Sequence, residues 1–90
     1  MTRAHVYIRG RVQGVFFRTS TRDKARSLDV NGWVKNCLDG SVEAVCEGEK
    51  DAIDAIVQWC SEGPPGAFVE DVDVCLEEYT GTFEEFSVVY

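Results

Sequence analysis

The sequence feature that most limits the possible folds is a pair of alternating segments on either side of Asp39-Gly40. The segments "WVKNC" (33–37) and "SVEAVCEG" (41–48) place apolar side chains at alternate positions, the period of a half-buried strand. An Asp-Gly pair between two such segments favours a two-residue hairpin turn. The two segments are therefore predicted to be antiparallel neighbours in one sheet.

Two segments with apolar residues at helical spacing lie on either side of this hairpin. The first predicts a helix over 17–28, which we expect to end in left-handed backbone at Asn31-Gly32. The second predicts a helix that stops before the loop sequence "EGPPG" (62–66). The residues that define the two patterns are Phe17, Thr21, Ala25 and Leu28, and then Ile53, Ile56, Val57 and Cys60.

Alternating segments predict the remaining strands at 4–10 and 68–79, with a short last strand in 86–90. The resulting order is β-α-β-β-α-β followed by an extra strand or strand extension. This order is typical of the α+β class and of the ferredoxin-like α/β sandwich, in which two helices cover one face of an antiparallel sheet. Since 90 residues with 44% apolar side chains suffice for a single core, we expect one domain over 1–90.

Charge is divided unevenly along the chain. Residues 1–36 hold eight Lys and Arg against two Asp, whereas residues 37–90 hold one Lys against fourteen Asp and Glu. The net charge of −7 argues against broad nucleic-acid binding, which needs an extended basic surface. No segment has the ~20 apolar residues of a membrane span, and no signal-peptide pattern begins the chain. We therefore expect a cytoplasmic protein whose partners include neither nucleic acid nor membrane.

The spacing of the cysteines gives no support to a metal site. It contains no C-x-x-C pair, and the sequence has a single histidine, His5, so neither a metal nor another cofactor is expected. Two of the cysteines would lie several rungs apart on the predicted hairpin, too far for a disulfide. We interpret all four as reduced thiols. They are Cys37, Cys46, Cys60 and Cys75.

The basic half of the chain contains the loop "GRVQGVFFR" (10–18), between the first strand and the first helix. Amide groups of a curled loop and of a helix's first turn can bind an oxyanion together, and Gly10 and Gly14 would permit the curl and a close backbone approach. Arg18 would add a planar set of donors that suits phosphate. The loop lacks the nucleotide P-loop and dinucleotide-binding motifs. By these rules it is either an anion site or a connection with solvated arginines.

Two segments together resemble the signatures of the acylphosphatase family. They are "GRVQGVFFR" (10–18) and "GWVKNCLDGSVE" (32–43), which occur in the family's order, and the similarity continues to the ending "FSVVY". The resemblance implies a ferredoxin-like fold. It also implies an enzyme that hydrolyses the carboxyl–phosphate bond of small acyl phosphates, without a metal, to a carboxylate and inorganic phosphate.

The resemblance further implies roles for particular residues. Arg18 would bind the phosphoryl group together with loop amides, and Asn36 would orient the attacking water. Inorganic phosphate would be the product and a competitive ligand. The implied loop amides belong to Arg11, Val12, Gln13, Gly14, Val15 and Phe16.

This reaction explains why the sequence needs no catalytic histidine. The leaving carboxylate has a conjugate acid of pKa about 4, so it departs without a proton. Catalysis then consists of positioning and of neutralising charge on the phosphoryl oxygens. Because Asn36 cannot accept a proton, the substrate's own phosphate oxygen would take it.

Several other residues carry weaker expectations. His5 is expected to be structural. The hydroxyls of 19–21 have two possible roles, capping the first helix or contacting the substrate, and capping is the expected one. The aromatic residues Phe16, Phe17, Trp33 and Trp59 are expected to be packing residues. Trp33 and the thiol of Cys37 are also expected near the site, since both are close to Asn36 in sequence. Asp29 stands where the family commonly has glycine, which would leave the left-handed conformation to Asn31.

Four other roles are compatible with the same fold. A single-stranded RNA reader would need aromatic residues in the strand at 41–48, which has none. A metal chaperone would need a C-x-x-C loop, and a sensor domain is normally attached to a larger enzyme. The amino-terminal domain of a larger carbamoyl-transferring protein would be followed by zinc-finger sequence.

We therefore expect a stand-alone enzyme. It is predicted to be a monomer, because no exposed apolar patch is apparent in the sequence. The sequence does not distinguish among acetyl phosphate, carbamoyl phosphate, a glycolytic acyl phosphate and a phosphorylated aspartate, which share the same anhydride bond.

Overall fold

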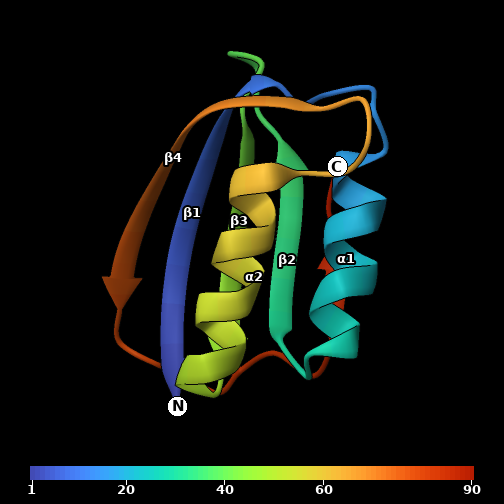
Figure 1. The fold of residues 1–90 in the computed structure, drawn as a ribbon. Coiled ribbons are helices and arrows are strands. Elements are labelled where there is room, and N and C mark those ends of the chain that lie inside the picture. Colours follow the sequence, from blue (N-terminus) through green and yellow to red (C-terminus); the bar gives the residue numbers. More distant parts are fainter.

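The computed structural model describes residues 1–90 as a five-stranded sheet with two helices packed on one face (Figure 1). The order of the strands across the sheet is β4-β1-β3-β2-β5. This arrangement confirms the predicted α+β ferredoxin-like sandwich. In chain order the elements are β1 (Thr2–Arg11), α1 (Phe17–Ser27), β2 (Asn31–Asn36), β3 (Val42–Gly48), α2 (Lys50–Glu62), β4 (Phe68–Glu77) and β5 (Phe86–Val88).

The pairing of β5 with β2 departs from the predicted antiparallel sheet. These two strands are parallel, with Gly32 opposite Phe86 and Val34 opposite Val88, whereas all other pairs are antiparallel. The chain leaves β4 at one edge of the sheet and crosses to the other edge, where it runs in the direction of β2. As a result, the carboxyl terminus lies beside the first turn of α1 (Figure 1).

The hairpin turn between β2 and β3 has three residues, 38–40, enclosed by Cys37 and Ser41, rather than the predicted two. The Cys37 amide donates to the Ser41 carbonyl (2.8 Å), and the Gly40 amide donates to the Cys37 carbonyl (3.2 Å). Gly40 has a φ of +92°, which suits the left-handed position of a three-residue hairpin loop. The Asp39 carboxylate accepts hydrogen bonds from the hydroxyl and the amide of Ser41, and these bonds hold the pKa of Asp39 below its ordinary value.

Helix α1 ends at a left-handed residue that the sequence analysis assigned incorrectly. Asp29 itself has a φ of 57°, and Asn31 already belongs to β2. The Val30 amide donates to the Ala25 carbonyl (2.9 Å) and the Asp29 amide to the Arg26 carbonyl (3.3 Å). This is the pattern of a Schellman motif, whose geometry requires the left-handed residue directly after the last helical turn.

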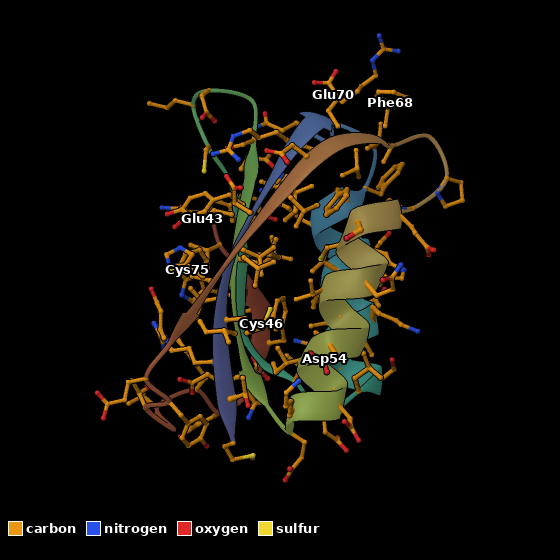
Figure 2. The ribbon with its side chains drawn as sticks, turned by 60° about the vertical axis from the view of Figure 1, so that its left-hand side comes forward. Glu43, Cys46, Asp54, Phe68, Glu70 and Cys75 are labelled. Atoms are coloured by element: carbon orange, nitrogen blue, oxygen red, sulfur yellow. The ribbon has the colours of Figure 1, made fainter.

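The hydrophobic core lies between the sheet and the helices. Cys46, labelled in Figure 2, lies in this layer between β3 and α2, and burial raises the pKa of its thiol to about 12. Burial also raises the pKa of Cys60 on α2. The predicted helical patterns are confirmed, because their members are buried or packed against the core. They are Phe17, Thr21, Ala25 and Leu28 on α1, and Ile53, Ile56, Val57 and Cys60 on α2.

The sheet has an exposed edge at β4 that the sequence analysis did not predict. Phe68, Val74 and Leu76 are 64%, 45% and 70% exposed, and they are spread along the strand, with Phe68 opposite Arg11 and Leu76 opposite Ala4. Neither helix is both long enough and apolar enough to cross a membrane.

The conformation of Asp29 predicts the effect of two substitutions. Asp29→Gly should raise the free energy of unfolding by about 0.5 kcal/mol, because glycine adopts positive φ without steric cost. Asp29→Ala should lower the free energy of unfolding by about 1 kcal/mol, because alanine adopts positive φ less readily than aspartate does. Urea denaturation of the three proteins measures both effects. A glycine variant no more stable than the alanine variant would contradict the assigned helix ending.

Candidate active site

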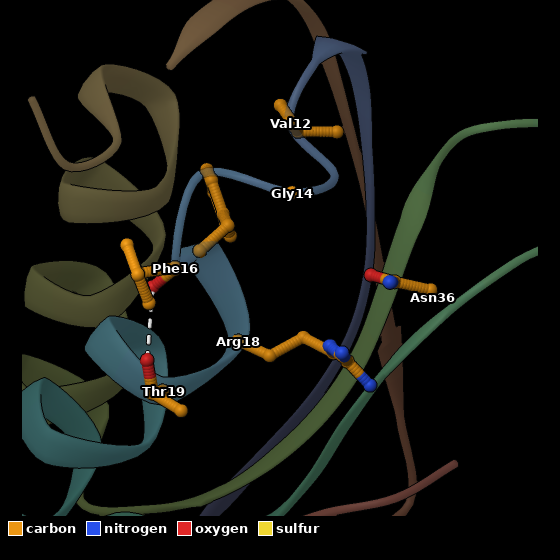
Figure 3. Close-up of a pocket in the computed structure, with 7 residues that line it drawn as sticks. Val12, Gly14, Phe16, Arg18, Thr19 and Asn36 are labelled. Carbon is orange, nitrogen blue, oxygen red and sulfur yellow. Dashed lines mark hydrogen bonds between the residues drawn. The ribbon is translucent and has the colours of Figure 1, made fainter. Parts of the chain in front are cut away.

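A pocket of about 220 Å³ lies where the amino end of α1 faces the carboxyl end of β2 (Figure 3). The pocket brings residues from 12–19 together with Asn36, which lies at the far end of α1 and β2 in the sequence. Both residues predicted to be catalytic, Arg18 and Asn36, line it. The complete lining consists of Val12, Gly14, Phe16, Phe17, Arg18, Thr19 and Asn36.

Two left-handed residues shape the loop that forms one side of the pocket. Gly14 has a φ of +76°, and a Cβ placed there would meet nothing within 4 Å, so the backbone angle rather than space favours glycine. Phe16 has a φ of 60° and is the N-cap residue of α1. Gly10 has a different role, because a Cβ at this position would lie 2.2 Å from the carbonyl oxygen of Phe68. It permits close approach to β4, not to a ligand.

No side chain of the protein caps the amino end of α1. Phe16 makes no side-chain capping hydrogen bond, and the first turn contains no acidic residue. The predicted capping by residues 19–21 is wrong for Thr19 and Thr21, whose hydroxyls donate back to the carbonyls of Phe16 (3.2 Å) and Phe17 (2.7 Å). Both threonines lie beyond the N-cap. The free amides and the helix dipole therefore favour an oxyanion in the pocket.

Arg18 extends from the first turn of α1 across the pocket toward Asn36 (Figure 3). Its guanidinium makes no salt bridge and no side-chain hydrogen bond within the chain. The carbon Cζ lies 4.9 Å from the centre of the Tyr90 ring, which the parallel β5 strand brings to this end of the sheet. A cation–π contact leaves the N–H groups at the edge of the guanidinium unoccupied. Arg18 can therefore present a planar set of donors to a phosphoryl group.

Asn36 is the last residue of β2, and its side chain faces the helices. Its Oδ1 atom is buried and has no hydrogen-bond partner. A buried polar atom without a partner costs about 1–3 kcal/mol, so such atoms are rare outside functional sites. The amide oxygen is thus available to accept a hydrogen bond from a water molecule or ligand in the pocket.

Gln13 has a structural role that the sequence analysis missed. Its Nε2 group donates to the carbonyls of Cys37 (2.8 Å) and Ser41 (2.9 Å), so it ties the loop to the β2–β3 hairpin next to Asn36. Its side chain does not line the pocket. The sequence signal was weak, since an amide between two glycines of a loop does not reveal a partner 24 residues away.

Two further residues of the predicted amide set lie outside the pocket lining. Arg11 ends β1 opposite Phe68, and Val15 packs against the hydrophobic core. The loop residues that do line the pocket are Val12, Gly14 and Phe16, at alternate positions.

Trp33 and Cys37 lie on the sheet face opposite the pocket, so the prediction that they are near the site is wrong. Successive side chains of a strand point to opposite faces, and Asn36 faces the helices. Trp33 makes an edge contact with His5, and the Cys37 thiol lies 3.6 Å from the Glu43 carboxylate. Glu43 is also on the outer face in Figure 2.

His5 lies on the same outer face. It contacts the carboxylates of Glu43 (2.5 Å) and Glu77 (3.2 Å) and stacks on Tyr7. Desolvation raises the pKa of Glu43, but hydrogen bonds from His5 and Tyr7 outweigh it, so the net shift is downward. This arrangement supports the expected structural role of His5.

Fold and pocket together define a ferredoxin-like α+β protein with an anion-binding type of loop at the start of its first helix. A family model described as Acylphosphatase matches residues 4–88. The acylphosphatase of Syntrophus aciditrophicus (strain SB) is 52% identical over 90 residues, which cover 100% of this chain and 94% of that protein.

Solved structures agree with the sequence comparison. The crystal structure of acylphosphatase from Bacillus subtilis superposes with a TM-score of 0.96 at 36% identity, covering 100% of both chains. An acylphosphatase from Coxiella burnetii gives a TM-score of 0.88 at 45% identity, covering 98% of this chain and 92% of that one. The chain belongs to the acylphosphatase family, and it is a hydrolase of acyl phosphates.

The hydrogen bonds of Gln13 predict that removing its side chain lowers kcat but leaves the affinity for inorganic phosphate almost unchanged. In Gln13→Ala the loop keeps its amides but loses its tie to the hairpin, so kcat should fall by about tenfold or more. The inhibition constant of inorganic phosphate should change by less than about threefold, because Arg18, the loop amides and the amino end of α1 all remain to bind the anion. Steady-state kinetics with phosphate as inhibitor measures both values. An unchanged kcat, or an equal loss of phosphate affinity, would contradict the positioning role.

Proposed function

We propose that Arg18 and amides of the loop 11–16 bind the phosphoryl group of a small acyl phosphate, and that Asn36 orients the attacking water. The observation that carries the proposal is the buried, unpaired Oδ1 of Asn36 in the pocket that Arg18 also lines. Val12, Gly14 and Phe16 are the loop residues best situated to supply amides, because they line that pocket.

Binding of the phosphoryl dianion would use three sources of positive potential. These are the guanidinium of Arg18, the loop amides and the uncapped amino end of α1. All three belong to the scaffold and need little rearrangement when charge develops on the phosphoryl oxygens, which is the condition for strong electrostatic stabilisation. The acidic remainder of the chain would leave this pocket as the main region that attracts anions.

The chemical step would be an in-line displacement at phosphorus. A water held by the Asn36 amide oxygen attacks phosphorus, and the bond between phosphorus and the carboxylate oxygen breaks. The bonding pair leaves with the carboxylate, which is stable without a proton. Because the Asn36 amide is not a base, the water proton passes to a phosphoryl oxygen. The products are a carboxylate and inorganic phosphate, and phosphate would also compete with substrate for the same donors.

We also propose that the protein is a monomer and that it is cytoplasmic. β4 is an edge strand with exposed apolar side chains, but its acidic residues Asp71, Asp73 and Glu77 oppose pairing with a second copy. The expected result is a sedimentation coefficient that does not vary with concentration, and a doubled mass at micromolar concentration would contradict it. Neither nucleic acid nor membrane is proposed as a partner.

The proposed roles predict different kinetic losses in two variants. Arg18→Ala should lower kcat/KM for benzoyl phosphate by about 10³-fold, because it removes fixed charge beside the phosphoryl oxygens. Asn36→Ala should lower kcat by about 10²-fold and preserve inhibition by inorganic phosphate, since it removes only the positioning of water. The assay follows loss of benzoyl phosphate in excess EDTA, with p-nitrophenyl phosphate as the ester control.

Arg22→Ala is the matched control for these variants. Arg22 also lies on α1, but it pairs with Asp23 and does not line the pocket. Its kcat/KM should remain within about twofold of wild type. Wild-type activity no higher than that of Arg18→Ala, or an equal loss in Arg22→Ala, would overturn the proposed site.

A further inference from the structure

The ring of Phe16 has no role in the folded core. Phe16 is 82% exposed and belongs neither to the buried cluster nor to the apolar side chains packed against it. It nevertheless lines the pocket, at the point where the loop becomes α1. The next residue, Phe17, is 2% exposed and supplies the core contact of this segment. The position of the Phe16 ring therefore needs an explanation other than packing.

Phe16 also has a backbone conformation that is unusual for an aromatic residue. A φ of 60° with a ψ of 25° is left-handed, a conformation that glycine or asparagine adopts far more readily than a bulky aromatic residue. The carbonyl of Phe16 is held there by the Ser20 amide (3.0 Å) and the Thr19 hydroxyl (3.2 Å). A large side chain kept in a strained conformation at the edge of a pocket is typical of a ligand contact.

The geometry of the reaction indicates which part of the substrate Phe16 would meet. In an in-line displacement, the attacking oxygen and the leaving oxygen lie on opposite sides of phosphorus. Asn36 lies on the β2 side of the pocket, whereas Phe16 and Thr19 lie on the opposite side, beside α1 (Figure 3). Water held by Asn36 would therefore expel the carboxylate toward Phe16 and Thr19.

We propose that the ring of Phe16 binds the acyl group of the substrate and selects aromatic and longer apolar acyl phosphates over acetyl phosphate and carbamoyl phosphate. This inference rests on the proposed function, because it takes the direction of attack from Asn36. An exposed ring can stack on an aromatic acyl group or cover an alkyl chain, and it gains little from a single methyl or amino group. The phosphoryl site supplies binding common to all substrates, and Phe16 supplies the discrimination among them.

A comparison of two substrates in three proteins tests the selection. Wild type should show a kcat/KM for benzoyl phosphate about tenfold above that for acetyl phosphate, and Phe16→Asn should lose most of this ratio. Asparagine is the chosen replacement because it tolerates positive φ and leaves the loop backbone as it is. Leu38→Asn is the control, since Leu38 is fully exposed on the hairpin turn and outside the pocket lining. It should preserve the ratio.

A binding measurement tests the contact between Phe16 and the acyl group without relying on catalysis. Benzylphosphonate and methylphosphonate carry the same anionic group on different substituents and are not hydrolysed. Calorimetry should show benzylphosphonate binding wild type about tenfold more tightly than methylphosphonate, with the difference lost in Phe16→Asn and kept in Leu38→Asn. Equal affinities in wild type, or an advantage that survives in Phe16→Asn, would overturn the role of Phe16.

The two proposals fail in different ways. If wild type hydrolyses neither acyl phosphate, the proposed function is wrong. If it hydrolyses both, with the same ratio of kcat/KM in wild type and Phe16→Asn, the function stands and the acyl-group role of Phe16 is wrong.

Discussion

Burial of Phe17 fixes the amino end of α1 against the sheet, and the geometry of the whole site depends on that contact. Its ring lies 5.7 Å from that of Trp59 on α2, and Gly63, where α2 ends, leaves room for it. Because Phe17 points into the core, the residues on either side of it are held at the pocket. Arg18 and Phe16 thus owe their positions to a hydrophobic contact that takes no part in the chemistry.

The site itself is a place where the fold leaves its polar groups unsatisfied. The Oδ1 of Asn36 has no partner, the first turn of α1 has no side-chain cap, and Arg18 makes no salt bridge. Elsewhere the chain satisfies comparable groups, as where Arg3 pairs with Glu47 and Glu77 on the outer face. Unmet donors and acceptors cost stability, and they converge where a phosphoryl group and a water would use them.

Short sequence patterns predicted the features that depend on neighbouring residues in the chain. Strand and helix periods located the sandwich, and two motifs located Arg18 and Asn36. The short last strand in 86–90 was predicted, but its parallel pairing with β2 was not, because that pairing depends on a crossover of the chain. The partners of Gln13 are likewise long-range contacts. By contrast, the misplacement of Trp33 and Cys37 was avoidable, since the two-residue period of a strand puts them on the face opposite Asn36.

We propose that the loop and the start of α1 form one preorganised anion site facing Asn36. Titration of the ¹⁵N-labelled protein with inorganic phosphate tests it directly, because amide resonances report each donor separately. Saturable shifts with a common dissociation constant are expected at Gly14, Phe16, Phe17 and the Asn36 side chain. Shifts concentrated on the exposed basic residues of α1, such as Arg22 and Lys24, with none at the loop, would contradict it.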